Sequence, residues 1–188
     1  MDFRPTDAHT ILRRTVREFA ESDIAPHVMA WDEAQRFPLE LLPKLADLGL
    51  MGIQFPERYG GAAMGAVDYC ICIEEWARVD PAIALSVAAH NGLAAAHIHM
   101  FGTDAQRDRY LTPLARGRHL GAWGLTEPQA GSDVGALSTK AEPNGDGTYA
   151  ISGQKIYISW GDNDFTGNVC HLVLARLPDG VPGTKGIS

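Results

Sequence analysis

The sequence is poor in cysteine and in basic residues. Its 188 residues include 3 Cys, and 16 Lys and Arg stand against 23 Asp and Glu, a formal net charge of -7. Three cysteines cannot build a disulfide framework, and Cys70 and Cys72 are one residue too close together for a zinc-binding CxxC pair. We therefore expect reduced, mostly buried thiols, with Cys170 among them, and a cytoplasmic protein.

The chain also has no dense cluster of Lys and Arg and no long apolar run. Sequence-independent binding to nucleic acid or to an anionic membrane needs a strongly basic surface. The longest apolar stretches, such as residues 82–89, are far shorter than the roughly 20 residues of a membrane-spanning helix. We therefore expect neither a nucleic-acid partner nor a membrane partner.

Glycine divides the sequence near residue 120, with 8 of the 20 glycines before that point and 12 after it. Apolar spacing before it predicts helices, and short β-rich runs after it predict strands separated by turns such as 144–147. The pattern indicates an α+β fold, with an all-α domain over residues 1–120 and a β domain over 121–188. The predicted helices span 11–24, 39–48, 66–79, 81–100 and 104–116, and the predicted strands span 149–151, 155–159 and 171–175.

The predicted helix 81–100 is nearly free of charge and rich in alanine, so we expect it to be buried on most sides or to line a pocket. It carries His90, His97 and His99. No carboxylate or Cys accompanies these histidines at ligand spacing, so packing is favoured over metal binding and no metal site is predicted.

The segment from Trp123 to Asp133 brings hydroxyls, small residues and main-chain amides into one loop. Thr126 and Ser132 supply hydroxyls, and glycine at 131 lets another group approach the main chain closely. Successive N–H groups in such a loop can bind an anionic pyrophosphate without Lys or Arg. Residue chemistry alone leaves this interpretation level with a polar turn between two strands.

Residues 124–136, read as GLTEPQAGSDVGA, resemble the signature of the acyl-CoA dehydrogenase family of flavoproteins without a gap. Further stretches resemble family landmarks in family order, and together they cover essentially the whole chain. These are PERYGG at 56–61, EEWAR at 74–78, FGT at 101–103 with Tyr110 and Leu111, and GQKIYIS at 153–159.

The resemblance implies an N-terminal helical domain followed by part of a middle β-barrel-like domain that binds FAD. It implies that Leu125 and Thr126 contact the flavin ring by main chain and hydroxyl, where negative charge develops as the ring accepts a hydride. Gly131 and Ser132 fall where the family loop meets the pyrophosphate, and Trp123 lies near the ring. Ser132 also falls where the pantetheine arm of an acyl-CoA passes.

The second segment of the implied site is the predicted strand 155–159. Tyr157, Ile158 and Ser159 are expected to contact the flavin, and alternation would place Tyr157 and Ser159 on one face. Packing of Tyr157 within the sheet is the alternative. On the helix 81–100, which in similar proteins walls the acyl pocket, His90 is the expected substrate contact beside its alternative packing role.

The implied activity is oxidation of an acyl-CoA thioester to a trans-2-enoyl-CoA, with electrons passed to an electron-transferring flavoprotein. No residue matches the glutamate that acts as general base in the family, so we expect it beyond residue 188 and expect the 188 residues alone to be inactive. The whole protein is expected to be a homodimer or homotetramer. A non-catalytic flavin- or CoA-binding or interaction module is the alternative, and DNA-binding proteins of this fold are disfavoured because a basic surface is missing.

Two further features bear on the length and the subgroup. The chain stops where an apolar strand begins, which suggests an N-terminal portion of a longer enzyme. Residues 160–168 form a longer link than many members have, which resembles a subgroup that acts on larger or unusual thioesters.

Overall fold

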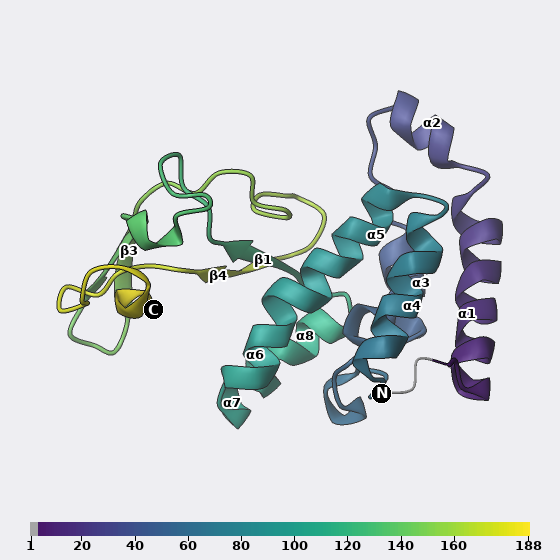
Figure 1. The fold of residues 1–188 in the computed structure, drawn as a ribbon, viewed down its shortest axis with the longest axis horizontal. Helices are drawn as coiled ribbons and strands as arrows, with labels where there is room; N and C mark the ends of the chain where they lie inside the picture. Colours follow the sequence, from purple (N-terminus) through teal and green to yellow (C-terminus); the bar gives the residue numbers. More distant parts are fainter. Residues whose placement is uncertain (1–3) are drawn as a thin grey trace.

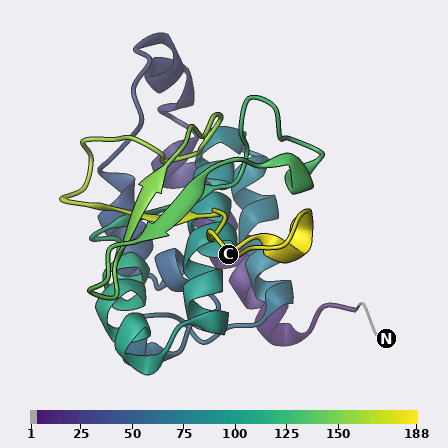
Figure 2. The same ribbon diagram turned by 90° about the vertical axis from the view of Figure 1, so that its left-hand side faces the viewer.

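A computed structural model describes residues 4–188, with helices at one end of the long axis and β structure at the other (Figure 1). Viewed from the β end, the strands lie in front of the helices (Figure 2). The predicted α+β class is confirmed, with helices dominant and a small β region after them. Among the described residues there is no closed barrel, because each of the two sheets has two strands.

Most helices begin and end where the sequence predicts. The α-helices are α1 (Asp7–Phe19), α2 (Val28–Glu33), α3 (Leu41–Asp47), α4 (Ala66–Ala77), α5 (Pro81–Ala88), α6 (Ala96–Phe101), α7 (Asp104–Gln106) and α8 (Thr112–Ala115). Asp80 caps α5, since its carboxylate accepts from the main-chain N–H groups of Ala82 and Ile83. Gly49 ends the helical stretch of α3 in a left-handed conformation with φ 73°.

Three of the predicted helices contain a π-helical segment. These segments are Ala20–Ile24, Ala89–Ala95 and Arg107–Leu111. A π-helical turn holds one extra residue and shifts the main-chain hydrogen bonds, which periodicity does not reveal. The short helix α2 was not predicted. It contributes Trp31, which is 8% exposed, to the core.

Two separate sheets form the β region. The strands are β1 (Leu120–Gly124), β2 (Lys140–Pro143), β3 (Tyr149–Ser152) and β4 (Val169–Val173). Strand β1 pairs with β4 in parallel, so that Ala122 faces His171, and β2 pairs with β3 in antiparallel. The predicted turn 144–147 joins β2 to β3 as expected, but β2 itself was not predicted.

The predicted strand 155–159 is wrong. These residues have no strand partner, and Tyr157 and Trp160 have φ values of 58° and 61°. A left-handed conformation costs β-branched and aromatic residues energy and cannot continue a strand. Residues 155–159 therefore do not form a strand, although their β-branched and aromatic composition predicts one.

The alanine-rich region is buried along one side, and Ala89 and Leu93 in its middle part line a pocket, which is one of the two placements predicted. Ala84, Ala94 and Ala95 are at most 2% exposed, whereas Leu85 and Met100 are 64% and 55% exposed. One side of α5 and α6 thus packs on the protein core, and the other presents apolar side chains to solvent. A helix rich in Ala can approach its neighbours closely on the packed side.

Glu75 on α4 is a buried carboxylate surrounded by arginines. It accepts from Arg13 at 2.7 Å, Arg17 at 2.8 Å and Arg78 at 2.8 Å, so it joins α1 to α4. The hydrogen bond from Arg17 is the largest cause that lowers the pKa of Glu75 to about 2, and Arg78 and Arg13 add to it against the effect of burial. The carboxylate therefore remains charged in the core.

Among residues 4–188, no helix is long and apolar enough to cross a membrane. In the same part of the chain, no cluster of at least three His, Cys, Asp or Glu side chains could hold a metal ion.

Replacing Glu75 with Gln is expected to lower the free energy of unfolding by about 2 to 3 kcal/mol at pH 7. The unfolded chain binds this proton more tightly than the folded one, so the contribution is present above pH 4.5 and disappears as the pH falls towards 2. Urea denaturation across this range is the measurement.

Glu74→Gln is the matched control, because the neighbouring Glu74 side chain is 61% exposed. It should change the stability by less than about 1 kcal/mol. Equal losses in the two variants would contradict a special role for the buried carboxylate.

Candidate functional site

The loop that follows β1 carries the first group of predicted site residues. It leaves the sheet at Gly124, turns at Leu125 and Thr126, and is closed by reciprocal main-chain hydrogen bonds between Glu127 and Ala130. Ile156 N–H donates to Thr126 O at 2.9 Å, which ties the loop to the second predicted segment. Two segments about 30 residues apart in sequence are thus held side by side.

A pocket of about 290 Å³ lies where these segments meet the alanine-rich helical region. Six of the eight residues predicted to contact a cofactor line it, and Ala89, Leu93 and Gly121 complete the lining. The six are Trp123, Leu125, Thr126, Tyr157, Ile158 and Ser159.

The segment around Ser159 is a constrained turn. Tyr157 is 92% exposed and has a positive φ of 58°, a left-handed conformation that is uncommon for an aromatic residue. Trp160 anchors the other end, since its indole N–H donates to Ser86 O at 3.1 Å and its ring meets Phe37 edge-on at 4.8 Å between centroids. The turn places three successive residues, Tyr157, Ile158 and Ser159, in the lining of the pocket.

Donors without partners face this pocket. Within residues 4–188, the hydroxyls of Thr126 and Ser159 and the Thr126 N–H make no hydrogen bond. The lining is otherwise apolar or aromatic. Such a site suits a flat ligand with a few acceptor atoms.

Gly131 and Ser132 lie beyond this pocket, at the exposed outer part of the loop. A Cβ built on Gly131 would meet no atom within 4 Å, so the main chain there is open to approach. Their predicted contacts with a pyrophosphate stay predictions. The exposed backbone leaves room for such a group.

Glu127 fixes the shape of the loop. Its buried carboxylate accepts from Ser138 N–H at 2.6 Å, Thr139 N–H at 3.0 Å, Gln129 Nε2 at 2.7 Å and Lys155 Nζ at 2.9 Å. Burial opposes ionisation, but the bonds from Thr139, Lys155 and Ser138 outweigh it and hold the pKa of Glu127 well below its usual value. Glu127 therefore braces the loop from its buried side.

His90 is a packing residue in this structure, which corrects its place among the expected substrate contacts. The side chain is completely buried and lines neither pocket. Its Nδ1 accepts from Gly121 N–H at 3.2 Å and its Nε2 donates to Leu114 O at 3.1 Å, so it joins β1 to α8. Burial lowers its pKa to about 4 and keeps the ring neutral.

Gly121 allows this close approach of strand and helix. A Cβ at Gly121 would lie 2.6 Å from the Cβ of Ala94, nearer than real side chains come. Beside His90, Asn91 accepts from Ile53 N–H and donates to Leu50 O, so both polar side chains of this π-helical segment satisfy main-chain groups. The hydrogen bonds and close packing of this segment fix the position of β1 relative to the helices.

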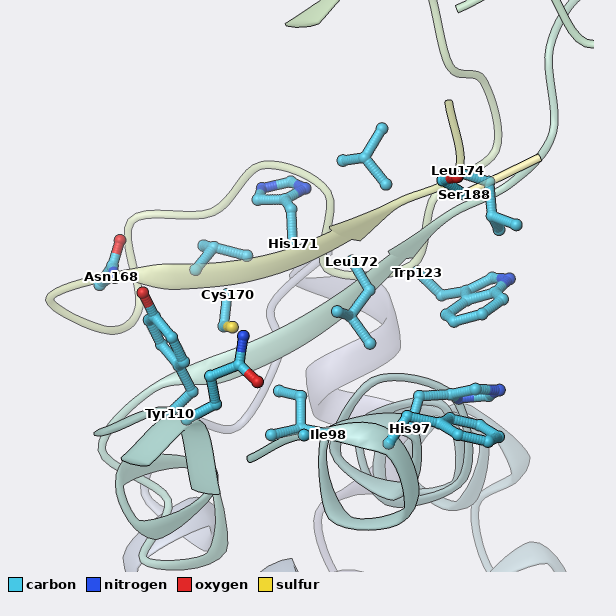
Figure 3. Close-up of a pocket in the computed structure, with 15 residues that line it drawn as sticks. His97, Ile98, Tyr110, Trp123, Asn168, Cys170, His171, Leu172, Leu174 and Ser188 are labelled. Atoms are coloured by element: carbon cyan, nitrogen blue, oxygen red, sulfur yellow. The ribbon is translucent and has the colours of Figure 1, made fainter. Parts of the chain in front are cut away.

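A second pocket of about 600 Å³ lies between β4 and the helical region, and sequence reasoning did not predict it (Figure 3). Cys170 and Leu172 point from β4 towards Ile98 and Tyr110, while His171 points to the opposite side. Trp123 lines both pockets and packs on His97, with ring centroids 4.1 Å apart and planes at 32°. The indole therefore separates the two cavities.

Sequence reasoning missed Lys155 and Trp160, which position the site. Both lie in or next to the GQKIYIS stretch, but their side-chain partners come from distant elements, the loop at 125–127 and the helix α5. The available signal for Lys155 was its place in the GQKIYIS stretch.

Comparison with known proteins identifies the family. Residues 6–118 match the family model described as acyl-CoA dehydrogenase, N-terminal domain. The chain belongs to the acyl-CoA dehydrogenase family. The short-chain-specific acyl-CoA dehydrogenase of Clostridium acetobutylicum is 42% identical over 188 residues, which are 100% of this chain and 48% of that protein.

Solved structures agree with this assignment. Butyryl-CoA dehydrogenase from Megasphaera elsdenii is 36% identical with a TM-score of 0.84, over 99% of this chain and 47% of that one. A glutaryl-CoA dehydrogenase from Mycobacterium smegmatis, in complex with FADH2, is 28% identical with a TM-score of 0.85, over 95% of this chain and 46% of that one. The chain spans about half the length of these relatives.

Replacing Glu127 with Gln is expected to lower the free energy of unfolding by about 3 kcal/mol, because Lys155 loses its buried counter-ion and an amide donor faces the Ser138 N–H. Hydrogen exchange of the amides at 127, 130, 138 and 139 should accelerate more than that of α4. Glu142→Gln, at an exposed position on β2, is the control. Unchanged exchange in the loop would show that Glu127 does not brace it.

The neutral His90 predicts a pH-dependent stability. The unfolded chain binds this proton with a pKa near 6.5 and the folded chain only near 4, so the free energy of unfolding should fall by about 3 kcal/mol as the pH drops from 6.5 to 4. His90→Gln should flatten this slope in urea denaturation, and His171→Gln, which changes an exposed histidine, should not. A slope that both variants retain would contradict the assignment.

Proposed function

We propose that this chain forms the helical and flavin-contacting part of an FAD-dependent acyl-CoA dehydrogenase. The observation that carries the proposal is the gathering of Trp123, Leu125, Thr126, Tyr157, Ile158 and Ser159 around one pocket. The FADH2 complex of the Mycobacterium smegmatis relative supports the cofactor. We also propose that residues 1–120 and 121–188 belong to separate domains of the longer protein.

The donor set of the pocket fits a flavin ring. Thr126 offers a hydroxyl and an N–H, and Ser159 offers a second hydroxyl, all without partners among residues 4–188. Tyr157 and Trp123 supply aromatic surface that excludes water from one end of a planar ligand. When bound, FAD would accept a hydride. Hydrogen-bond donors at the edge of its ring would stabilise the negative charge that develops there.

The exposed backbone at Gly131 and the Ser132 hydroxyl are proposed to meet the pyrophosphate, and Ser132 also the pantetheine of the substrate. The protein contributes main-chain amides there, because the loop from 128 to 133 has no Lys or Arg. Binding of the pyrophosphate would then depend on amide geometry.

The proposed reaction is α,β-oxidation of a short-chain acyl-CoA to a trans-2-enoyl-CoA. The name of the Clostridium acetobutylicum relative supports the short chain, and its alignment covers the link 160–168, so that link gives no support for a larger-substrate subgroup. The general base is proposed to lie in the part of the longer relatives that this chain does not span. The 188 residues alone are therefore expected to be inactive.

We further propose an electron-transferring flavoprotein as acceptor, a homodimer or homotetramer as the assembly, and a cytoplasmic location. The family resemblance supports the first two. The three cysteines are unpaired, which supports a reducing compartment.

The experiment is an absorbance spectrum followed by anaerobic addition of butyryl-CoA. The protein spanning the length of the relatives should bind FAD and lose its oxidised flavin spectrum, while the 188 residues should keep theirs. Reduction by the 188 residues alone would contradict the placement of the base. FAD binding with no reduction in the longer protein would favour the non-catalytic module, and no FAD binding would overturn the proposal.

Thr126→Ala should weaken FAD binding about fivefold, because one neutral hydrogen bond is lost. Titration of flavin fluorescence measures this change. Ser152→Ala, a hydroxyl deletion at an exposed position on β3, is the matched control and should leave the affinity unchanged. Equal affinity for FAD in Thr126→Ala and the parent would show that the Thr126 hydroxyl does not bind the flavin.

A further inference from the structure

We propose that Lys155 is a positioning residue that holds the two walls of the small pocket together and polarises the peptide group between Leu125 and Thr126. Its Nζ donates to Leu125 O at 3.0 Å and to Glu127 Oε1 at 2.9 Å. The part of the inference that concerns flavin rests on the proposed function. The part that concerns the peptide group does not.

The geometry puts the two walls in register. Lys155 donates to the carbonyl of Leu125, and the next residue, Ile156, donates through its N–H to the carbonyl of Thr126 at 2.9 Å. Two successive carbonyls of one wall are therefore bound by two successive residues of the other. The side chains that follow, Tyr157 to Ser159, are placed opposite Thr126 by these bonds.

Burial makes the Lys155 contact strong. The side chain is 13% exposed, and its carboxylate partner on Glu127 is 1% exposed. Ser138 and Thr139 hold that carboxylate from the other side through their main-chain N–H groups. The ammonium is thus fixed between a carboxylate and a carbonyl, where a charge acts more strongly than in water.

The contact affects an N–H of the pocket lining that has no partner among residues 4–188. Leu125 C=O and Thr126 N–H belong to the same peptide group, whose electrons are delocalised over oxygen, carbon and nitrogen. A cation on the oxygen withdraws electron density from the nitrogen and makes the N–H a better donor. That N–H has no partner among residues 4–188 and belongs to a residue that lines the pocket.

The first test uses the intact chain without flavin and measures the amide proton shift of Thr126 by NMR. In Lys155→Met the amide proton should move upfield, since the carbonyl loses its cationic partner, while Lys155→Arg should stay near the parent value. Lys140→Met, at an exposed lysine on β2, is the control and should have no effect. Lys155→Gln, which keeps a neutral donor, should shift the amide in the same direction by less and serves if the Met variant does not fold.

The second test uses the flavin-loaded protein. Lys155→Met should raise the dissociation constant of FAD about tenfold and make the reduction potential of the bound flavin more negative, and Lys155→Arg should restore both. A purely structural role would lower the melting temperature while leaving the Thr126 shift and the flavin potential unchanged, and that result overturns the inference. A parent protein that binds no flavin would defeat the proposed function while the NMR result still decides the role of Lys155.

Discussion

The buried carboxylate of Glu127 is the contact on which the site depends. Four different residues donate to it, from its own loop, from residues 138–139 and from Lys155. An ionised group in the interior is costly unless each of its acceptor sites is used, so this arrangement has one stable geometry. The loop at Leu125 and Thr126 takes its shape from that geometry, and through Lys155 the opposing turn does too.

The helical region sets where this loop stands. His90 and Asn91, neighbours in one π-helical segment, bind main-chain groups of β1, α8 and residues 50–53. Because Gly121 has no side chain, β1 can lie directly against Ala94. The pocket floor formed by Ala89 and Leu93 is thereby fixed relative to Trp123 and Thr126. The helical and β regions, which the distribution of glycine divides near residue 120, together hold the pocket lining in place.

Sequence patterns predicted the helices well because their caps and periodicity are local. Asp80 followed by Pro81 marks the start of a helix, and in the structure the Asp80 side chain caps α5. The prediction of a strand at 155–159 failed because β propensity cannot reveal left-handed residues such as Tyr157 and Trp160. Trp160 is held by a hydrogen bond to Ser86 on α5, far away in the sequence. The site residues came from resemblance to a family. The residues that brace them, such as Glu127, Lys155 and Trp160, act through long-range hydrogen bonds that spacing does not show.

The central claim is that the small pocket holds the flavin ring, with Thr126 and Ser159 at its edge and Trp123 separating it from the larger cavity beside β4. A crystal structure of the FAD-loaded protein tests this claim directly. We expect ring density within hydrogen-bond distance of the Thr126 hydroxyl and N–H and of the Ser159 hydroxyl. Ring density in the cavity between Tyr110 and Leu172, or contacts that leave Thr126 and Ser159 untouched, would contradict it.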